Sequence, residues 1–390
     1  MGRVSSARLP GLDTLRAVAI VAVMLYHLEP FLPERLAVVG QFGWMGVDLF
    51  FVLSGYLIGS QLLKPYVSGD EPSLREFYRR RAYRILPAYL VVLLLYYFFP
   101  AWRESEVLPP LWQFVTFTVN LFVNMRHHAF SHVWSLCVEE HFYLVLPLLV
   151  IWAMRRPSAR WTVIFIAAVV LFGVVVRGSL LLPLLKPFGW DGGGVVPENF
   201  GSFYFKYLYY PTYARLDGLV AGVTLALIRL FRPGWWEALA RRGHAALAVG
   251  VGCVGAVCWM FRDVDLGEET RAAAWATVVG FPLLACGLGL VVASSISRNG
   301  WLSRLRVPGA RMMATLAYSL YLMHKEIAHV DRVYLPALTA NRDWRTVVVY
   351  GVSCLVGAGM LYVGVERPFM GLRDRIGRRG VVEMRGEPAL

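Results

Sequence analysis

Ionisable side chains lie within or at the ends of long apolar runs of this chain. They are His27, Asp48, the Glu139–Glu140 pair, Arg215 with Asp217, and His324 with Lys325. A charge is costly in a membrane-like environment, so each is a candidate functional residue. Different predicted helices therefore bring acids, bases and cations to one layer, a coincidence that composition alone does not explain.

A second group of charges lies near the opposite ends of the same runs. Arg16 precedes His27 by eleven residues, so both lie on one helix face with their backbones about 16 Å apart. Arg81 and Arg84 occur in the run RRRAYR. Guanidinium groups bind phosphates in a fixed geometry. The spacing predicts that a phosphate-bearing donor is held at the arginine end and presents its reactive end to His27.

Several of these residues also have simpler interpretations. Arg16 fits a side chain that reaches back to the membrane surface, and Asp13 fits a helix N-cap. The RRRAYR run fits a signal for membrane orientation. His324 with Lys325 fits an interface feature as well as a site. His127, His128 and His132 have no cysteine or carboxylate at ligand spacing, so we expect no metal site.

The elements that position these residues are predicted to be membrane-spanning helices. The 390 residues are 57% hydrophobic and 17% charged, whereas soluble domains carry about 25% charged residues. Continuous apolar runs of about 17–22 residues favour helices over a β-barrel. The sequence therefore predicts an all-α bundle of ten spans, over 12–29, 43–63, 84–100, 134–154, 161–182, 212–231, 245–261, 272–293, 312–328 and 345–364.

The positions of arginine and lysine predict the orientation of the bundle. An apolar segment at 111–125 is short and contains several polar residues. If it does not cross, most basic residues outside the spans lie on one side, as expected for the cytoplasmic side. We therefore predict cytoplasmic termini and a re-entrant or interfacial helix at 111–125. Residues 1–376 form one predicted membrane domain, and 377–390 a basic tail. The net charge of +13 arises from the inner loops and does not indicate nucleic acid.

Seven segments resemble, in order, the acyltransferase 3 family of integral membrane O-acyltransferases. They are LDTLRAVAIVAVMLYH (12–27), GVDLFFVLSGYLI (46–58), FYRRRAYRILPAY (77–89), HVWSLCVEEHFYL (132–144), YARLDGLVAG (213–222), YSLYLMH (318–324) and VERPF (365–369). The family's Arg-x10-His pattern is Arg16 and His27, and its Arg-x-x-Arg pattern is Arg81 and Arg84. One departure is that Lys325 and Glu326 follow His324, where many members have an aromatic residue and a proline. The chain looks like the stand-alone form, without a fused hydrolase-like domain.

The resemblance implies transfer of an acyl group, often acetyl, from cytoplasmic acyl-CoA. The expected acceptor is a hydroxyl of an extracytoplasmic or lipid-linked carbohydrate or of a glycosylated product. We expect His27 to be the base or a transient acyl carrier, oriented by Glu139 or Asp48, and Arg16, Arg81 and Arg84 to hold the donor phosphates. The expected substrate contacts are Ser54, Trp134, Ser135, Glu140 and Arg215, although Arg215 also fits a counter-ion for an embedded carboxylate.

Two other classes of protein use intramembrane charges or apolar bundles. A transporter or flippase of an amphiphilic glycan or lipid is the main alternative, and a structural subunit of a secretion machine is another. Neither would form an ester. The expected location is the plasma (bacterial inner) membrane, with the lipid bilayer, acyl-CoA and a carbohydrate or glycolipid as partners. The loop 183–211 is the expected acceptor-reading surface. The sequence does not indicate the oligomeric state.

Overall fold

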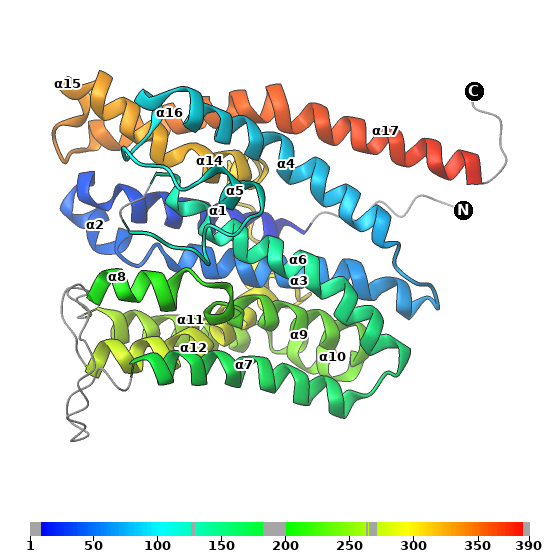
Figure 1. The fold of residues 1–390 in the computed structure, drawn as a ribbon. Coiled ribbons are helices and arrows are strands. Elements are labelled where there is room, and N and C mark those ends of the chain that lie inside the picture. Colours follow the sequence, from blue (N-terminus) through cyan, green and yellow to red (C-terminus); the bar gives the residue numbers. More distant parts are fainter. Residues whose placement is uncertain (1–8, 126–128, 182–199, 263, 265–270, 385–390) are drawn as a thin grey trace. The chain divides into compact units, whose positions relative to one another are not determined.

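The computed structural model describes residues 9–125, 129–181, 200–262, 264 and 271–384. It confirms the predicted all-α class, because the described residues form helices and turns and contain no strand. Figure 1 labels most of the helices named below. By their contacts the residues fall into two compact units. The first comprises residues 1–19, 44–70 and 107–311, and the second comprises 20–43, 71–106 and 312–390. Helix α1 (Pro10–Leu28) contributes to both, and the predicted single domain over 1–376 stays a prediction.

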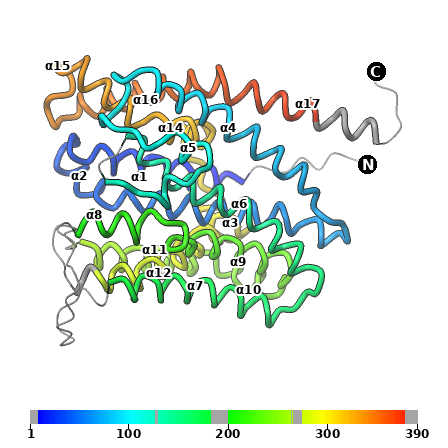
Figure 2. The backbone as a smooth tube through the Cα atoms, in the orientation of Figure 1, coloured from blue at the N-terminus to red at the C-terminus, as the bar shows by residue number. Residues whose placement is uncertain are grey.

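The first unit is built on long apolar helices. They are α3 (Met45–Val67), α6 (Trp134–Arg155), α7 (Ala159–Leu181), α9 (Asp217–Phe231), α11 (Gly243–Phe261) and α12 (Arg271–Ile296). Shorter elements connect them: α5 (Leu111–Val115), η3 (Ser131–Val133), α8 (Phe200–Tyr204), η6 (Phe205–Tyr209), η7 (Thr212–Ala214), α10 (Pro233–Arg241) and α13 (Trp301–Arg304). Helices α11 and α12 lie side by side, as the tube in Figure 2 shows.

Small residues bring α3 and α9 into close contact. A Cβ atom added to Gly55 of α3 would lie 2.1 Å from the Leu219 carbonyl oxygen, and one added to Gly222 of α9 would lie 2.2 Å from the Val52 carbonyl oxygen. Only glycine allows this approach of the two backbones, as in many membrane helix pairs. This packing fixes the register between the α3 turn that carries Asp48 and the start of α9.

The second unit combines the end of α1 with the C-terminal helices. Its long helices are α4 (Leu74–Phe98), α14 (Ala310–Tyr334), α16 (Trp344–Leu361) and α17 (Arg367–Met384). Its short elements are η1 (Glu29–Phe31), α2 (Glu34–Gly40), η2 (Pro100–Trp102), α15 (Pro336–Thr339) and η8 (Tyr362–Glu366). Side chains cap two of the helices: the Glu76 amide donates to Ser73 Oγ at the start of α4, and the Thr346 amide donates to Asp343 Oδ1 at the start of α16.

Eight of the ten predicted spans meet the length and apolar composition of a membrane-crossing helix among the described residues. The other two, 212–231 and 312–328, are also helical. However, α9 has 15 residues because η7 and Arg215 precede it. Helix α14 has 25 residues, but charged and polar side chains interrupt its apolar sequence. The cytoplasmic location of the termini stays a prediction.

The segment 111–125 forms less helix than the sequence predicts. Helix α5 ends at Val115, and Phe117 adopts the left-handed conformation with φ of 56°. The Thr118 amide donates to the Gln113 carbonyl oxygen at 2.8 Å, which closes the last turn. A left-handed residue with such a bond is a common way to end a helix. The remainder of the described segment consists of turns.

Candidate active site

Two histidines of the second unit form a hydrogen-bonded pair. His27, at the end of α1, is half-buried, and His324, in the middle of α14, is fully buried. His324 Nε2 lies 2.8 Å from His27 Nδ1. The sequence placed both residues near the outer end of a predicted span but did not pair them. It predicted a carboxylate, Glu139 or Asp48, beside His27.

Backbone carbonyl groups determine which ring nitrogens of this pair carry protons. His324 Nδ1 lies 2.9 Å from the Tyr321 carbonyl oxygen and 3.1 Å from that of Leu320. A carbonyl oxygen only accepts, so Nδ1 of His324 carries the proton and Nε2 of the neutral ring accepts. His27 Nδ1 must then be the donor. In the neutral pair His27 Nε2 is left unprotonated, which is the state that a general base requires.

The residues that follow His324 contribute to the packing of the second unit. Lys325 Nζ lies 3.2 Å from Glu104 Oε1, and the Tyr96 hydroxyl donates to Glu104 Oε2 at 2.8 Å. Glu326 is fully buried. The Lys325–Glu104 ion pair therefore links α14 to the segment that follows α4. This gives the departure from the family pattern a structural role.

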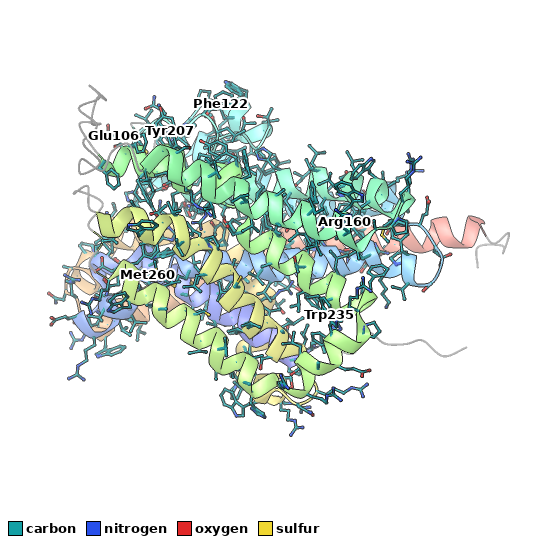
Figure 3. The ribbon with its side chains drawn as sticks, turned by 90° about the horizontal axis from the view of Figure 1, so that it is seen from below. Glu106, Phe122, Arg160, Tyr207, Trp235 and Met260 are labelled. Carbon is teal, nitrogen blue, oxygen red and sulfur yellow. The ribbon has the colours of Figure 1, made fainter. Side chains whose placement is uncertain are left out.

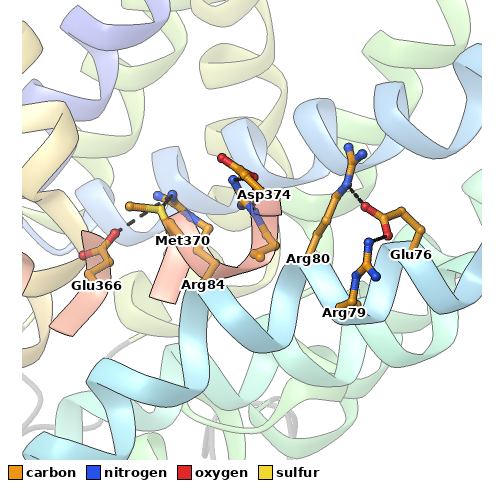
Figure 4. A network of polar contacts seen from close by, with 8 residues as sticks. Glu76, Arg79, Arg80, Arg84, Glu366, Met370 and Asp374 are labelled. Carbon is orange, nitrogen blue, oxygen red and sulfur yellow. Dashed lines mark hydrogen bonds and ion pairs between the residues drawn. The ribbon is translucent and has the colours of Figure 1, made fainter. Parts of the chain in front are cut away.

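The arginines of α4, of which Arg81 and Arg84 were predicted to bind the donor, differ in their partners (Figure 4). Arg79 and Arg80 both pair with Glu76. Arg84 Nη1 lies 4.0 Å from Glu366 Oε1 and 3.6 Å from Met370 Sδ. Arg81 is half-buried on the same helix. The charges of Arg79 and Arg80 are thus largely satisfied within α4, whereas Arg84 faces the junction of η8 and α17.

Helix α14 connects the arginine region to the histidine pair. The Ser319 hydroxyl donates to Glu366 Oε2 at 2.9 Å, and the Tyr318 hydroxyl donates to the Ile85 carbonyl oxygen at 2.9 Å. His324 follows Ser319 by five residues, which is about 7.5 Å along the helix axis. The Arg84–Glu366 contact therefore lies beside Ser319 of α14, and the histidine pair lies about 7.5 Å further along the same helix. Arg16 is half-buried, on the part of α1 that belongs to the first unit.

In the first unit Arg215 is the counter-ion of Asp48, as the sequence analysis allowed. Arg215 Nη2 donates to both carboxylate oxygens, at 2.9 and 3.0 Å, and both side chains are buried. The guanidinium carbon lies 4.0 Å from the ring centre of Phe281 and 4.5 Å from that of Tyr209. Trp134, a predicted substrate contact, belongs to the same aromatic cluster, with its ring 4.9 Å from that of Tyr209.

A second buried ion pair lies nearby, and its arginine, Arg177, is not among the predicted site residues. Arg177 donates to Asp217 through two nitrogens, at 2.7 and 3.0 Å, and to the Ala214 carbonyl oxygen at 2.6 Å. Arg177 lies within the predicted span 161–182, so its charge inside an apolar run was the available signal. Both ion pairs join the start of α9 to its neighbours. One pair uses α3 and the other uses α7.

The predicted residues Ser54 and Glu139 are connected through a tyrosine. The Tyr143 hydroxyl donates to Glu139 Oε2 at 2.9 Å and is also hydrogen-bonded to Ser54 Oγ. Because the carboxylate accepts the tyrosine proton, Ser54 donates to Tyr143. Ser135 is buried in the first turn of α6, and Glu140 is half-buried. This row of hydroxyl groups joins α3 to α6.

Two predicted regions fall outside the described residues in whole or in part. They are the histidine group, of which His127 and His128 are not described, and the loop 183–211, which is described only from residue 200. His132 is buried in η3. Residues 200–209 form α8 and η6, and Tyr209 at the end of η6 is one of the rings that pack around Arg215.

Comparisons with known proteins agree with the resemblance seen in the sequence. A profile of the acyltransferase 3 family, described as an acyltransferase domain, matches residues 9–363. A Staphylococcus aureus (strain COL) protein named "Putative O-acetyltransferase SACOL0978" is 27% identical over 384 residues, which cover 93% of this chain and 57% of that protein. The O-acetyltransferase OatA of Staphylococcus aureus (strain NCTC 8325 / PS 47) is 26% identical over 340 residues, covering 82% of this chain and 50% of OatA.

The chain thus spans about half the length of the curated relatives it matches. No solved structure matches it. The family profile nevertheless extends over α1 and its histidine, the arginines of α4, the helices of both ion pairs and α14. Since that match covers far more than half of the residues, the chain belongs to the acyltransferase 3 family.

Proposed function

We propose that this chain is a membrane-embedded O-acyltransferase. It transfers an acyl group, acetyl in the first instance, from cytoplasmic acyl-CoA to a hydroxyl of an extracytoplasmic or lipid-linked carbohydrate. The family match and the O-acetyltransferase names of its relatives support the reaction class. The eight apolar helices support a membrane location, which we assign to the plasma (bacterial inner) membrane.

The observation that carries the proposed chemistry is the hydrogen bond between His27 and His324. His27 Nε2 removes the proton from the acceptor hydroxyl, and the resulting oxygen nucleophile attacks the thioester carbonyl carbon. The carbon–sulfur bond then breaks, and the CoA thiolate takes the proton from the His27 imidazolium. His324 holds the His27 ring in the required tautomer, so neither Asp48 nor Glu139 is needed for that task.

A variant of this mechanism uses His27 as a carrier. In it, His27 Nε2 attacks the thioester carbonyl carbon, and the carbon–sulfur bond breaks to release the CoA thiolate. The acceptor oxygen then attacks the acyl carbon, the acyl–nitrogen bond breaks, and the freed Nε2 takes the acceptor proton and passes it to the thiolate. The same tautomer serves both versions, because each needs an unprotonated Nε2. Acyl-enzyme isolated after incubation with radiolabelled acetyl-CoA, and absent from His27→Ala, would favour the carrier.

The arginines and the remaining polar residues have supporting roles in this proposal. Arg84 and Arg81, together with Arg16, bind the phosphates of CoA, with Arg84 about one and a half helical turns of α14 from the histidine level. The Ser54–Tyr143–Glu139 row is a candidate contact for the substrates. We assign the Asp48–Arg215 pair to holding α3 against α9 rather than to catalysis.

The proposal is tested by thiol release from acetyl-CoA. Purified protein in liposomes is incubated with acetyl-CoA alone and with an envelope glycan extract, and free CoA thiol and carbohydrate esters are measured. An O-acyltransferase releases thiol faster with the extract and leaves one ester per thiol on it. A transporter, flippase or structural subunit gives no release that depends on the extract, and that result would overturn the proposal.

A further inference from the structure

A shallow, open cleft of about 580 Å³ lies on the surface beside the end of α1 in the second unit. None of its lining residues belongs to the predicted site. Its volume lies in the usual range for sites that bind small molecules or sugars, about 300–1,000 Å³. Its lining consists of Glu29, Glu34, Ala37, Val38, Gln41 and Arg342.

Hydrogen bonds and close backbone packing hold the residues around this cleft against the end of α1, which carries His27. Arg342 Nε donates to the Leu32 carbonyl oxygen at 3.1 Å, and its Nη2 donates to the Glu29 carbonyl oxygen at 3.4 Å. The end of α2 packs directly on α1, since a Cβ atom added to Gly40 would lie 2.9 Å from the Leu25 carbonyl oxygen. Close backbone contact of this kind leaves little room for α2 to move.

An apolar core beneath the cleft connects it to the histidine pair. Leu28 and Leu32 pack with Ala328 of α14 and with Tyr350 of α16. Leu28 follows His27 directly, and Ala328 is one helical turn beyond His324. Glu29 is two residues from His27, so their backbones lie within about 7 Å of each other. One residue of the cleft lining is therefore two positions along the chain from the proposed base, which does not itself line the cleft.

The chemistry of the lining suits a ligand with many hydroxyl groups. The Gln41 amide nitrogen donates to the Val38 carbonyl oxygen at 3.0 Å, so its Oε1 remains as an acceptor. The carboxylates of Glu29 and Glu34 are also acceptors, and the guanidinium group of Arg342 supplies donors. Val38, with 58% of its surface exposed, offers an apolar contact for a sugar ring. Two carboxylates and one guanidinium give the cleft a net negative charge, which disfavours a polyanionic ligand.

From these features we infer that the cleft binds the acceptor, and that the acceptor is a neutral, hydroxyl-rich carbohydrate. Hydroxyl groups of the bound carbohydrate donate to Glu29 and Glu34. This binding places a further hydroxyl of the same carbohydrate at His27. The inference rests on the proposed O-acyltransferase function and on the predicted outer location of residues 30–42. It also assigns acceptor recognition to the end of α1, whereas the sequence predicted the loop 183–211 for this role.

Two probes of equal length but different charge test the inference. Liposomes with the full chain are given acetyl-CoA and either chitotetraose, which is neutral, or tetragalacturonate, which is anionic. We expect chitotetraose to stimulate thiol release and tetragalacturonate to fail. In the Glu29→Gln/Glu34→Gln variant we expect the KM for chitotetraose to rise about tenfold, because two hydrogen bonds to the sugar are weakened, with kcat and the KM for acetyl-CoA unchanged.

Glu106→Gln is the matched control, because it neutralises an exposed carboxylate that does not line the cleft. Thermal unfolding checks that all variants fold. The inference is overturned if the double variant keeps the wild-type KM, if the anionic probe is used equally well, or if neither probe stimulates release. In each case ester formation on the glycan extract still reports separately on the proposed function.

Discussion

The proposed base, His27, is hydrogen-bonded to a second imidazole, that of His324. The carbonyl oxygens of Leu320 and Tyr321 fix the tautomer of His324, which in turn fixes that of His27. A carboxylate beside His27 would also stabilise an imidazolium, whereas a neutral imidazole mainly orients the ring. Orientation by neighbouring hydrogen bonds is a common requirement for a catalytic histidine.

This arrangement predicts different effects for two substitutions of His324. A glutamine places a carbonyl oxygen near His27 Nδ1 and keeps an amide donor for the α14 carbonyl groups, whereas an alanine leaves His27 without this partner. We expect kcat to fall about 10²-fold in His324→Ala and less than about tenfold in His324→Gln, with the KM for acetyl-CoA unchanged in both. Steady-state thiol release measures both constants. Equal losses in the two variants would contradict the orienting role.

The arginines of α4 are expected to separate by function according to their partners. Arg84→Ala removes a proposed phosphate ligand, so the KM for acetyl-CoA should rise about tenfold or more, as expected for loss of a charge-assisted hydrogen bond. Arg80→Ala removes an exposed side chain already paired with Glu76 and should change this KM less than about twofold. Arg84→Lys keeps a positive charge near Glu366 and is the control for loss of folding in Arg84→Ala. An unchanged KM in Arg84→Ala would exclude Arg84 as a donor ligand.

At the residue scale, the sequence predicted where the ionisable residues lie along the helices better than it predicted which residues they contact. Hydropathy placed His27, Asp48 and Arg215 within or at the ends of apolar runs, and the counter-ion interpretation of Arg215 was right. It did not pair His27 with His324, because these residues are 297 positions apart and spacing does not show which helix faces meet. For the same reason the Tyr143 link between Ser54 and Glu139 was not predicted.

At the scale of elements, the close contact between α3 and α9 depends on glycines, which have no side chain to separate the two backbones. Gly55→Ala would put a Cβ atom 2.1 Å from a backbone oxygen, whereas at Gly59 on the same helix the nearest atoms are carbons of Ala226 and Val223 at 3.4 Å, an ordinary van der Waals contact. We expect Gly55→Ala to lower the free energy of unfolding by about 1–3 kcal/mol, the usual cost of overpacking. Gly59→Ala should cost less than about 1 kcal/mol. Thermal unfolding in detergent compares them, and equal stability would contradict the close packing.

The helices themselves were largely predictable, and their interruptions were not. Continuous apolar runs identify membrane helices because the bilayer requires every backbone group to be bonded internally. The ends of α5 and α9 depend instead on local geometry, such as the left-handed Phe117 and the η7 turn before Arg215. Hydropathy averages over about twenty residues and does not detect such turns.

At the scale of the molecule, the predicted orientation can be checked within the first unit. Arg160 and Trp235, predicted inner residues, lie toward one end of its helices, and Tyr207 and Met260 lie toward the other (Figure 3). This arrangement agrees with the order of the predicted inner and outer loops. Trp235 and Tyr207 are both at least partly exposed to labelling reagents.

A membrane-impermeant maleimide tests which end faces outward. We expect Tyr207→Cys to be labelled on intact cells, and Arg160→Cys and Trp235→Cys only after the membrane is opened, because basic loops remain on the cytoplasmic side. The unsubstituted chain is the control for its five native cysteines, all of which lie in predicted spans. Labelling of Arg160→Cys on intact cells would reverse the orientation and, with it, the side from which acyl-CoA enters.

The central claim is that the imidazole of His27 is indispensable for moving the acyl group. The most direct measurement is ester formation on the glycan extract by His27→Ala, compared with the wild-type protein at equal folded concentration. The account predicts a fall of about 10²–10⁴-fold, the usual contribution of a general base. Ester formation within about twofold of the wild-type rate would contradict both the general-base and the acyl-carrier versions of the mechanism.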